Sequence, residues 1–147
     1  MDKRSGVLGW NAVGLIGVIA LLHALATLYG WYYTIRWFDI PMHVAGGVWV
    51  ALWFAYDIVS RRRWIDGRRF MPFLVFGIAT VALVGIVWEF YEFFLDIIVL
   101  KSYALNAAPG YLHFDTLKDL FDDILGGVIA LCLTWFWFFR GRLEGAE

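Results

Sequence analysis

Four long apolar stretches dominate this sequence of 147 residues. A helix needs about 20 apolar residues to cross the hydrocarbon core of a bilayer. Backbone polar groups must be satisfied internally in lipid, so such stretches form helices rather than isolated strands. The composition agrees, because 62% of the residues are hydrophobic and 17% are charged. The sequence therefore predicts an all-α polytopic membrane protein, a single domain over 1–147 with transmembrane helices at about 7–30, 41–60, 70–100 and 117–139.

Charge and cysteine usage exclude several classes of protein. The net charge of -1 is too balanced for a nucleic-acid-binding protein, so no nucleic-acid partner is expected. The single cysteine, Cys132, allows neither an intramolecular disulfide nor a zinc site built from cysteines. Membrane lipids are the partners that this composition favours.

Basic residues predict the orientation in the membrane. Nine of them lie at the termini or in the loop between the second and third helices: Lys3, Arg4, Arg61, Arg62, Arg63, Arg68, Arg69, Arg140 and Arg142. The remaining three lie in or beside the other two loops: Arg36, Lys101 and Lys118. Loops rich in Lys and Arg stay in the cytoplasm. We expect a multi-pass protein of a bacterial-type inner (plasma) membrane, with both termini cytoplasmic and with 31–40 and 101–116 outside.

Acidic residues show the opposite bias. Eight of them lie at or near the outer ends of the second, third and fourth helices: Asp39, Glu89, Glu92, Asp96, Asp115, Asp119, Asp122 and Asp123. Residues three or four apart share one face of a helix. Asp39 and His43 have this spacing, and so do Asp119 and Asp123. Three helices therefore direct acidic side chains to one depth on one side of the membrane.

The segments 39–48 and 119–128 also form a weak internal repeat. Their polar residues and their glycine pairs, Gly46-Gly47 and Gly126-Gly127, fall at identical offsets. Small residues let transmembrane helices approach closely. Two hairpins related by an axis along the membrane normal are one interpretation, and a chance match of apolar sequence is the other.

Carboxylates at membrane depth are costly, by about 2.5–3.5 kcal/mol each on insertion scales. The acids here outnumber the nearby bases, so either several of them are protonated or a cation binds. Oxygen ligands with one imidazole suit Mg²⁺, Mn²⁺, Fe²⁺ or Zn²⁺. The sequence predicts a divalent metal ion, with identity open, on the ligands His43, Glu89, Glu92, Asp119 and Asp123.

Four further polar residues are candidates for roles at this site. Asp39 and Asp115 are candidate catalytic residues, as a general base that does not bind the metal. Capping of the helices that they precede is the alternative for both. Arg36 and Lys118 are candidates for binding an anionic headgroup.

The remaining polar and aromatic residues near this depth have simpler interpretations. His23 and His113 are expected to be structural or solvated, with a second imidazole ligand as the alternative. Asp96 and Asp122 are expected to face water or headgroups. Trp88 is expected to be an anchor at the membrane interface.

The motifs FDIPMHVAGG at 38–47, WEFYE at 88–92 and DTLKDLFDDILG at 115–126 resemble those of the small YjdF-like inner-membrane proteins. They are more distantly similar to those of VanZ-like proteins, which typically carry Gln and Asn where this chain has Glu92 and Asp123. The resemblance implies a role in the cell envelope, linked in VanZ-like members to glycopeptide resistance. The additional acidity favours a stronger cation site in this chain.

We therefore expect a metal-dependent membrane enzyme, a hydrolase or transferase, that acts at the outer leaflet on a lipid or a lipid-linked envelope precursor. The alternative is a non-catalytic protein, either a cation or proton transporter or a metal-stabilised binding module. The inner halves of the helices offer only Asp57, Asn11 and Thr134 as polar groups, which disfavours conduction by a monomer. A homo-oligomer remains possible.

Overall fold

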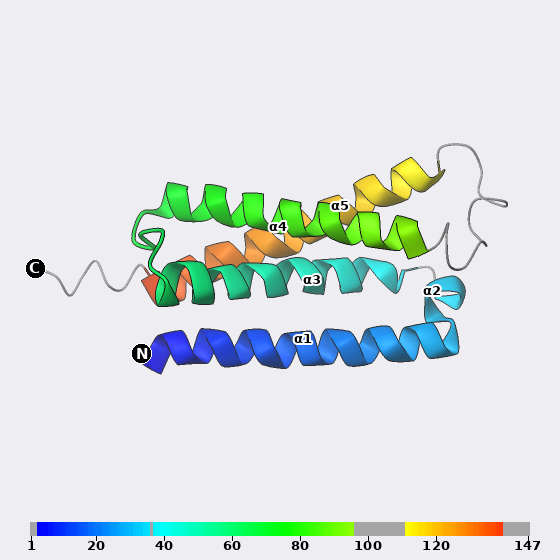
Figure 1. The fold of residues 1–147 in the computed structure, drawn as a ribbon, viewed down its shortest axis with the longest axis horizontal. Coiled ribbons are helices and arrows are strands. Elements are labelled where there is room, and N and C mark those ends of the chain that lie inside the picture. Colours follow the sequence, from blue (N-terminus) through cyan, green and yellow to red (C-terminus); the bar gives the residue numbers. More distant parts are fainter. Residues whose placement is uncertain (1–2, 36, 96–110, 140–147) are drawn as a thin grey trace, which may run out of the picture.

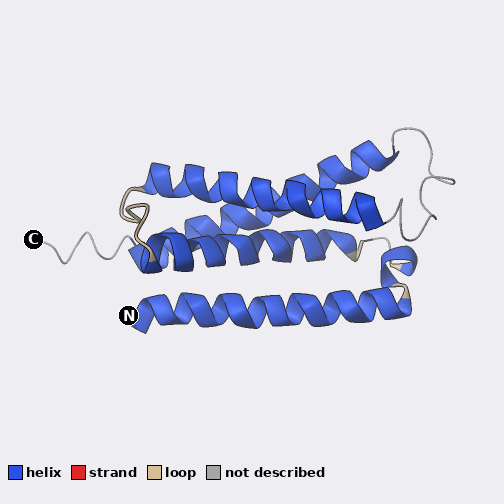
Figure 2. Cartoon of the chain, in the orientation of Figure 1, coloured by secondary structure: helices blue, strands red, loops and turns tan. Residues whose placement is uncertain are grey.

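The structure, a computed structural model, describes residues 3–35, 37–95 and 111–139. Within these residues every regular element is a helix (Figure 2). Four helices are long and apolar enough to cross a membrane: Ser5–Tyr29, Asp39–Arg61, Phe70–Phe94 and Phe114–Phe139. The predicted all-α architecture with four transmembrane helices is confirmed.

The elements are α1 Lys3–Tyr29, α2 Trp31–Thr34, α3 Asp39–Phe54, η1 Ala55–Arg61, α4 Phe70–Phe94, α5 Tyr111–Thr134 and η3 Trp135–Phe139. The π-helical segments η1 and η3 continue α3 and α5 without a break. The fourth transmembrane helix is expected at about 117–139; α5 begins at Tyr111, and the apolar span within it and η3 is Phe114–Phe139. The expected end of the third helix at 100 lies outside the described residues.

All four long helices run along one axis, and α3 and α5 begin at the same end of the bundle (Figure 1). We call this end, which carries Asp39 and Asp119, the acidic end, and the opposite end, with the loop 62–69, the basic end. α3 packs against α1, α4 and α5, while α4 packs mainly on α5. α1 is peripheral, since 11% of its apolar window is buried compared with 44% for the span that begins at Asp39.

Glycines bring α3 and α5 into backbone contact, as the sequence predicts. A Cβ atom at Gly47 would overlap the backbone carbonyl of Asp123, and one at Gly126 would overlap the carbonyl of Val44. Only residues without a side chain allow two helices this close approach. The approach places the polar faces of α3 and α5 against each other near the acidic end.

The half of the bundle nearer the basic end has an apolar core. Phe54, Phe73 and Leu131 are each at most 1% exposed. The Phe73 ring lies 5.7 Å from the Phe54 ring and 5.2 Å from the Phe139 ring, within the range of favourable aromatic pairs. This packing holds the ends of α3, α4 and α5 together, so the polar cluster at the other end has a rigid base.

Asp57 anchors the basic end of the bundle. Its side chain is buried, and its carboxylate accepts hydrogen bonds from Arg61 Nη1 at 3.0 Å and Arg62 Nε at 2.6 Å. Asp66 in the following loop is exposed, and a hydrogen bond from the Arg68 backbone N–H lowers the pKa of its carboxyl group. The basic loop is therefore tied to the end of η1 by ion pairs.

Candidate functional site

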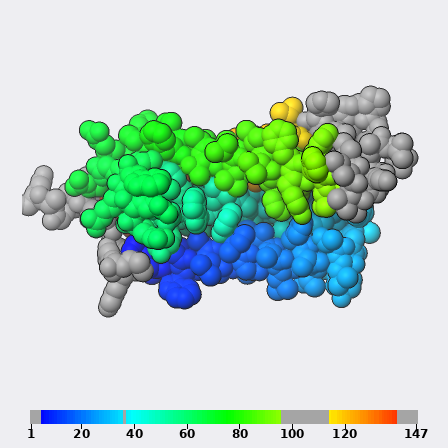
Figure 3. All heavy atoms as spheres, viewed as in Figure 1, coloured from blue at the N-terminus to red at the C-terminus, as the bar shows by residue number. Residues whose placement is uncertain are grey.

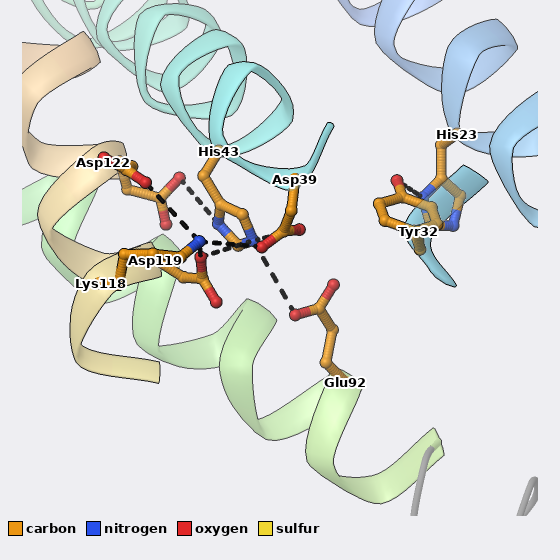
Figure 4. A network of polar contacts seen from close by, with 9 residues as sticks. His23, Tyr32, Asp39, His43, Glu92, Lys118, Asp119 and Asp122 are labelled. Atoms are coloured by element: carbon orange, nitrogen blue, oxygen red, sulfur yellow. Dashed lines mark hydrogen bonds and ion pairs between the residues drawn. The ribbon is translucent and has the colours of Figure 1, made fainter. Parts of the chain in front are cut away.

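His43 lies at the acidic end of the bundle, and its side chain is 4% exposed. Its Nε2 atom lies 3.4 Å from Asp39 Oδ1, 3.8 Å from Asp119 Oδ1 and 4.0 Å from Glu92 Oε2. Its Nδ1 atom lies 3.6 Å from Asp123 Oδ1. Figure 4 shows carboxylates from α3, α4 and α5 directed toward this one imidazole. His43 is therefore the centre on which three helices converge.

Lys118 supplies a positive charge beside these carboxylates. Its Nζ atom donates a hydrogen bond to Asp39 Oδ2 at 3.0 Å and another to Asp119 Oδ1, and it lies 3.8 Å from Asp122 Oδ2 (Figure 4). The bond to Asp39 links α3 and α5 across 79 positions of sequence. Lys118 thus holds two acids of the cluster in place and offsets part of their charge.

Two groups of three potential metal ligands share His43. One consists of Asp39, His43 and Asp119, and the other of His43, Glu89 and Glu92, with one donor atom from each residue within 4.8 Å of the others. Glu89 Oε1 is buried and lacks a hydrogen-bond partner among the described side chains. An unsatisfied buried carboxylate oxygen is costly, so it marks a position that suits a cation.

The structure brings all five predicted metal ligands into one cluster, together with Asp39 and Lys118. We call the following residues the acidic cluster: Asp39, His43, Glu89, Glu92, Lys118, Asp119, Asp122 and Asp123. Helical phase predicts most of it, because the members on one helix are three or four residues apart. Their functional roles stay predictions.

Helix capping does not account for Asp39 or Asp115. Phe38 occupies the N-cap position of α3, and the Asp39 carboxylate contacts Lys118 instead. α5 begins at Tyr111, so Asp115 lies beyond its first turn. Asp115 is half-buried and stands outside the two groups of potential ligands in the described structure.

The sequence predicts that Asp122 faces water or headgroups, but in the structure its side chain is buried. It is 7% exposed and lies beside Lys118, one turn earlier on α5, which draws it inward. Arg36 and Asp96 lie outside the described residues, as does the side chain of His113. The expectations for these three residues stay predictions.

A second pair of polar side chains lies beside the cluster and was not found from the sequence. The Tyr32 hydroxyl and His23 Nδ1 share a hydrogen bond of 2.8 Å (Figure 4). Burial and the negative charges of Glu92 and Asp39 raise the pKa of Tyr32, which keeps the phenol protonated. Trp88 contacts the His23 ring edge-on at 5.9 Å. Tyr32 belongs to α2, in a segment expected to be a loop, so helical phase gave no signal for it.

A cavity of about 280 Å³ adjoins the cluster between α1, α3 and α4. Asp39, His43, Glu92 and Asp123 line it at the acidic end, with Tyr32 beside them. The rest of its wall is mainly apolar. The buried cluster is therefore reachable along a hydrophobic surface.

Comparison with known proteins identifies the family. The family described as "Predicted membrane protein (DUF2238)" matches residues 3–140, which is nearly the whole chain. Neither the curated proteins nor the solved structures contain a match to this chain. The YjdF family is the same family, so the resemblance of the sequence motifs is confirmed. The chain belongs to the DUF2238 family of predicted membrane proteins.

Proposed function

We propose that this protein is a metal-dependent membrane enzyme that acts on a lipid or a lipid-linked envelope precursor. The observation that carries the proposal is the pair of ligand groups that share the buried His43, each with three donor atoms within 4.8 Å. Carboxylate oxygens and one imidazole nitrogen are a donor set for Zn²⁺, Mn²⁺, Fe²⁺ or Mg²⁺. The unpaired oxygen of Glu89 fits the same interpretation.

The geometry around the imidazole supports one choice of ligands. Nε2 faces Asp39, Asp119 and Glu92, so it is the nitrogen placed to bind an ion with them. Nδ1 faces Asp123 alone. A histidine that binds a metal usually donates its other N–H to a carboxylate, which fixes the ring and its tautomer. We therefore assign Asp123 to the orientation of His43 rather than to the metal, in place of the ligand role expected from the sequence.

Charge balance supports a bound cation. Six acids of the cluster face one lysine and one histidine among the described side chains. Uncompensated charges at low dielectric repel one another strongly. A divalent cation would offset two of these charges and satisfy several oxygens at once. Lys118 already bonds two acids, so its contribution is to hold Asp39 and Asp119 rather than to remain free for substrate.

The chemistry that fits this site is hydrolysis or group transfer at a phosphoryl or carbonyl centre. A bound ion would supply Lewis acidity for that centre. A carboxylate outside the cluster, not engaged by the ion, can take a proton from water. Asp115 is half-buried on the same helix and is the candidate for this role. Positive-inside topology would place the reaction at the outer leaflet of the inner membrane.

The described core disfavours a transporter. Along α3, the buried Phe54 lies between His43 and Asp57, and it packs against Phe73. A proton or cation relay needs polar groups that continue across the membrane. The acidic cluster is therefore better suited to a reaction at one side than to conduction by a monomer.

A turnover assay tests the proposal. The protein is stripped with a chelator, reloaded with Zn²⁺, Mn²⁺, Fe²⁺ or Mg²⁺, and incubated in vesicles of total inner-membrane lipid, with products followed by mass spectrometry. We expect a product that requires the metal, and a loss in Asp119→Asn that exceeds the range of about 10–100-fold typical of residues that only orient a ligand. Asp66→Asn, which removes an exposed acid at the opposite end, should keep full turnover. Equal turnover in Asp119→Asn, or no product with any of the four metals, would contradict the proposal.

A further inference from the structure

The cavity beside the acidic cluster has an apolar wall made by membrane-spanning helices. Ile16, Ile19 and Ala20 line it from α1, and Val81 and Val84 line it from α4. Its volume of about 280 Å³ is close to the lower limit of small-molecule pockets, which is about 300 Å³. These residues lie within two membrane spans, so the wall is apolar at a depth where the surroundings are hydrocarbon.

The cavity lies where two helices leave a gap. α1 packs on α3 and η1, whereas α4 packs mainly on α5. Side chains of α3 remain visible between α1 and α4 on the surface (Figure 3). The edge-on contact of Trp88 with His23 joins α4 to α1 near the acidic end. A chain from the bilayer can therefore reach the cavity sideways, with its head toward the acidic cluster.

The charge of the cluster selects the headgroup. Glu92 is 33% exposed and Asp39 is 28% exposed, which makes them the most accessible of the four carboxylates around His43. The acids exceed the nearby cations even when one divalent ion is counted. Such a surface attracts an ammonium group and repels a headgroup with net negative charge.

We propose that this cavity binds one acyl chain of a zwitterionic, amine-bearing phospholipid and holds its ammonium group against Glu92, through the carboxylate oxygen that does not face His43 Nε2. Tyr32, whose hydroxyl shares a hydrogen bond with His23, lines the same end of the cavity. This inference deepens the proposed function, because it names the substrate class for the same site. Its charge argument holds with one divalent ion bound or with none.

Native mass spectrometry of the full chain tests the proposal. The protein is reconstituted in vesicles of equal parts phosphatidylethanolamine and phosphatidylglycerol and released in a mild detergent. We expect one retained phospholipid per chain, with phosphatidylethanolamine preferred by about tenfold, the effect of a single charge-assisted hydrogen bond. Glu92→Gln should lower this preference without emptying the cavity. Equal retention of the two lipids, or a preference for phosphatidylglycerol, would overturn the headgroup assignment.

Filling the cavity supplies matched variants. Ala20→Phe and Val84→Trp add bulk to its wall and should reduce lipid retention at least about tenfold, since a larger side chain and an acyl chain compete for the same volume. Ala24→Phe and Val87→Trp add the same bulk at exposed positions away from the cavity and should retain lipid as the wild type does. Full lipid retention in Ala20→Phe would show that a lipid chain does not occupy this cavity. A change in the oligomeric state of Ala20→Phe without loss of lipid would show the same.

Metal content measured on the same samples separates the two proposals. Ala20→Phe should lose lipid and keep metal. A wild type that retains phosphatidylethanolamine without metal would contradict the proposed function and support this inference. A wild type that holds metal but retains no preferred lipid would support the proposed function and contradict this inference.

Discussion

Replacing Gly126 with alanine tests the backbone contact between α3 and α5, on which the acidic cluster depends. A Cβ atom at Gly126 would overlap the Val44 carbonyl, and a backbone group cannot escape by changing rotamer, so the helices must separate. Overpacking costs about 1–3 kcal/mol, and an overlap with a backbone carbonyl lies in the upper part of that range. Alanine recovers about 1 kcal/mol of helix propensity. We expect a net loss of about 1–2 kcal/mol in the free energy of unfolding, together with displacement of Asp123 from His43.

Gly14→Ala is the matched control on α1, because a Cβ atom at Gly14 would meet nothing within 4 Å. It should leave the free energy of unfolding unchanged or raise it by up to about 1 kcal/mol. Reversible unfolding in mixed micelles of a mild detergent and sodium dodecyl sulfate, followed by circular dichroism, measures both variants. If Gly126→Ala unfolds at the same dodecyl sulfate fraction as Gly14→Ala, the close contact of α3 and α5 is refuted.

Asp57→Asn should lower the free energy of unfolding by about 1–3 kcal/mol, because it removes the negative charge and one of the two acceptor oxygens that Arg61 and Arg62 share, and the same micelle titration measures it. Chelation should lower the melting temperature at neutral pH, and it should lower it less in mild acid, because protonation relieves repulsion among the carboxylates. A bound ion present at 100 times its Kd stabilises the folded protein by about 2.7 kcal/mol, which sets the size of the expected effect. A cysteine at Arg63, in a background without Cys132, should resist an impermeant thiol reagent in intact cells and react in inverted vesicles; the opposite pattern would reverse the orientation.

The sequence predicts the features that depend on local pattern. Apolar length identifies the four spans, and helical phase places Asp39 with His43 and Asp119 with Asp123. Charge asymmetry separates the acidic end from the basic loop. Since these properties are set within one helix or one loop, they need no knowledge of which helices are neighbours.

The sequence cannot predict features that depend on contacts between distant segments. The hydrogen bond from Lys118 to Asp39 requires α5 to lie beside α3, and neither residue's own helix indicates it. The inward position of Asp122 follows from that same lysine. Tyr32 joins the site through a short helix that has no apolar periodicity. The bond from Arg62 in the basic loop to Asp57 in η1 likewise depends on how the chain turns after the helix.

The central claim is that His43 and the surrounding acids hold a divalent metal ion. Elemental analysis of the purified protein, by inductively coupled plasma mass spectrometry, tests it most directly. We predict about one divalent transition metal or Mg²⁺ ion per chain in the wild type and in Asp66→Asn, because Asp66 lies at the opposite end of the bundle. We predict a loss of most of this metal in His43→Gln, which removes the donor that both ligand groups share. A metal-free wild type that also fails to take up any of the four ions, or a His43→Gln protein with an unchanged metal content, would contradict the claim.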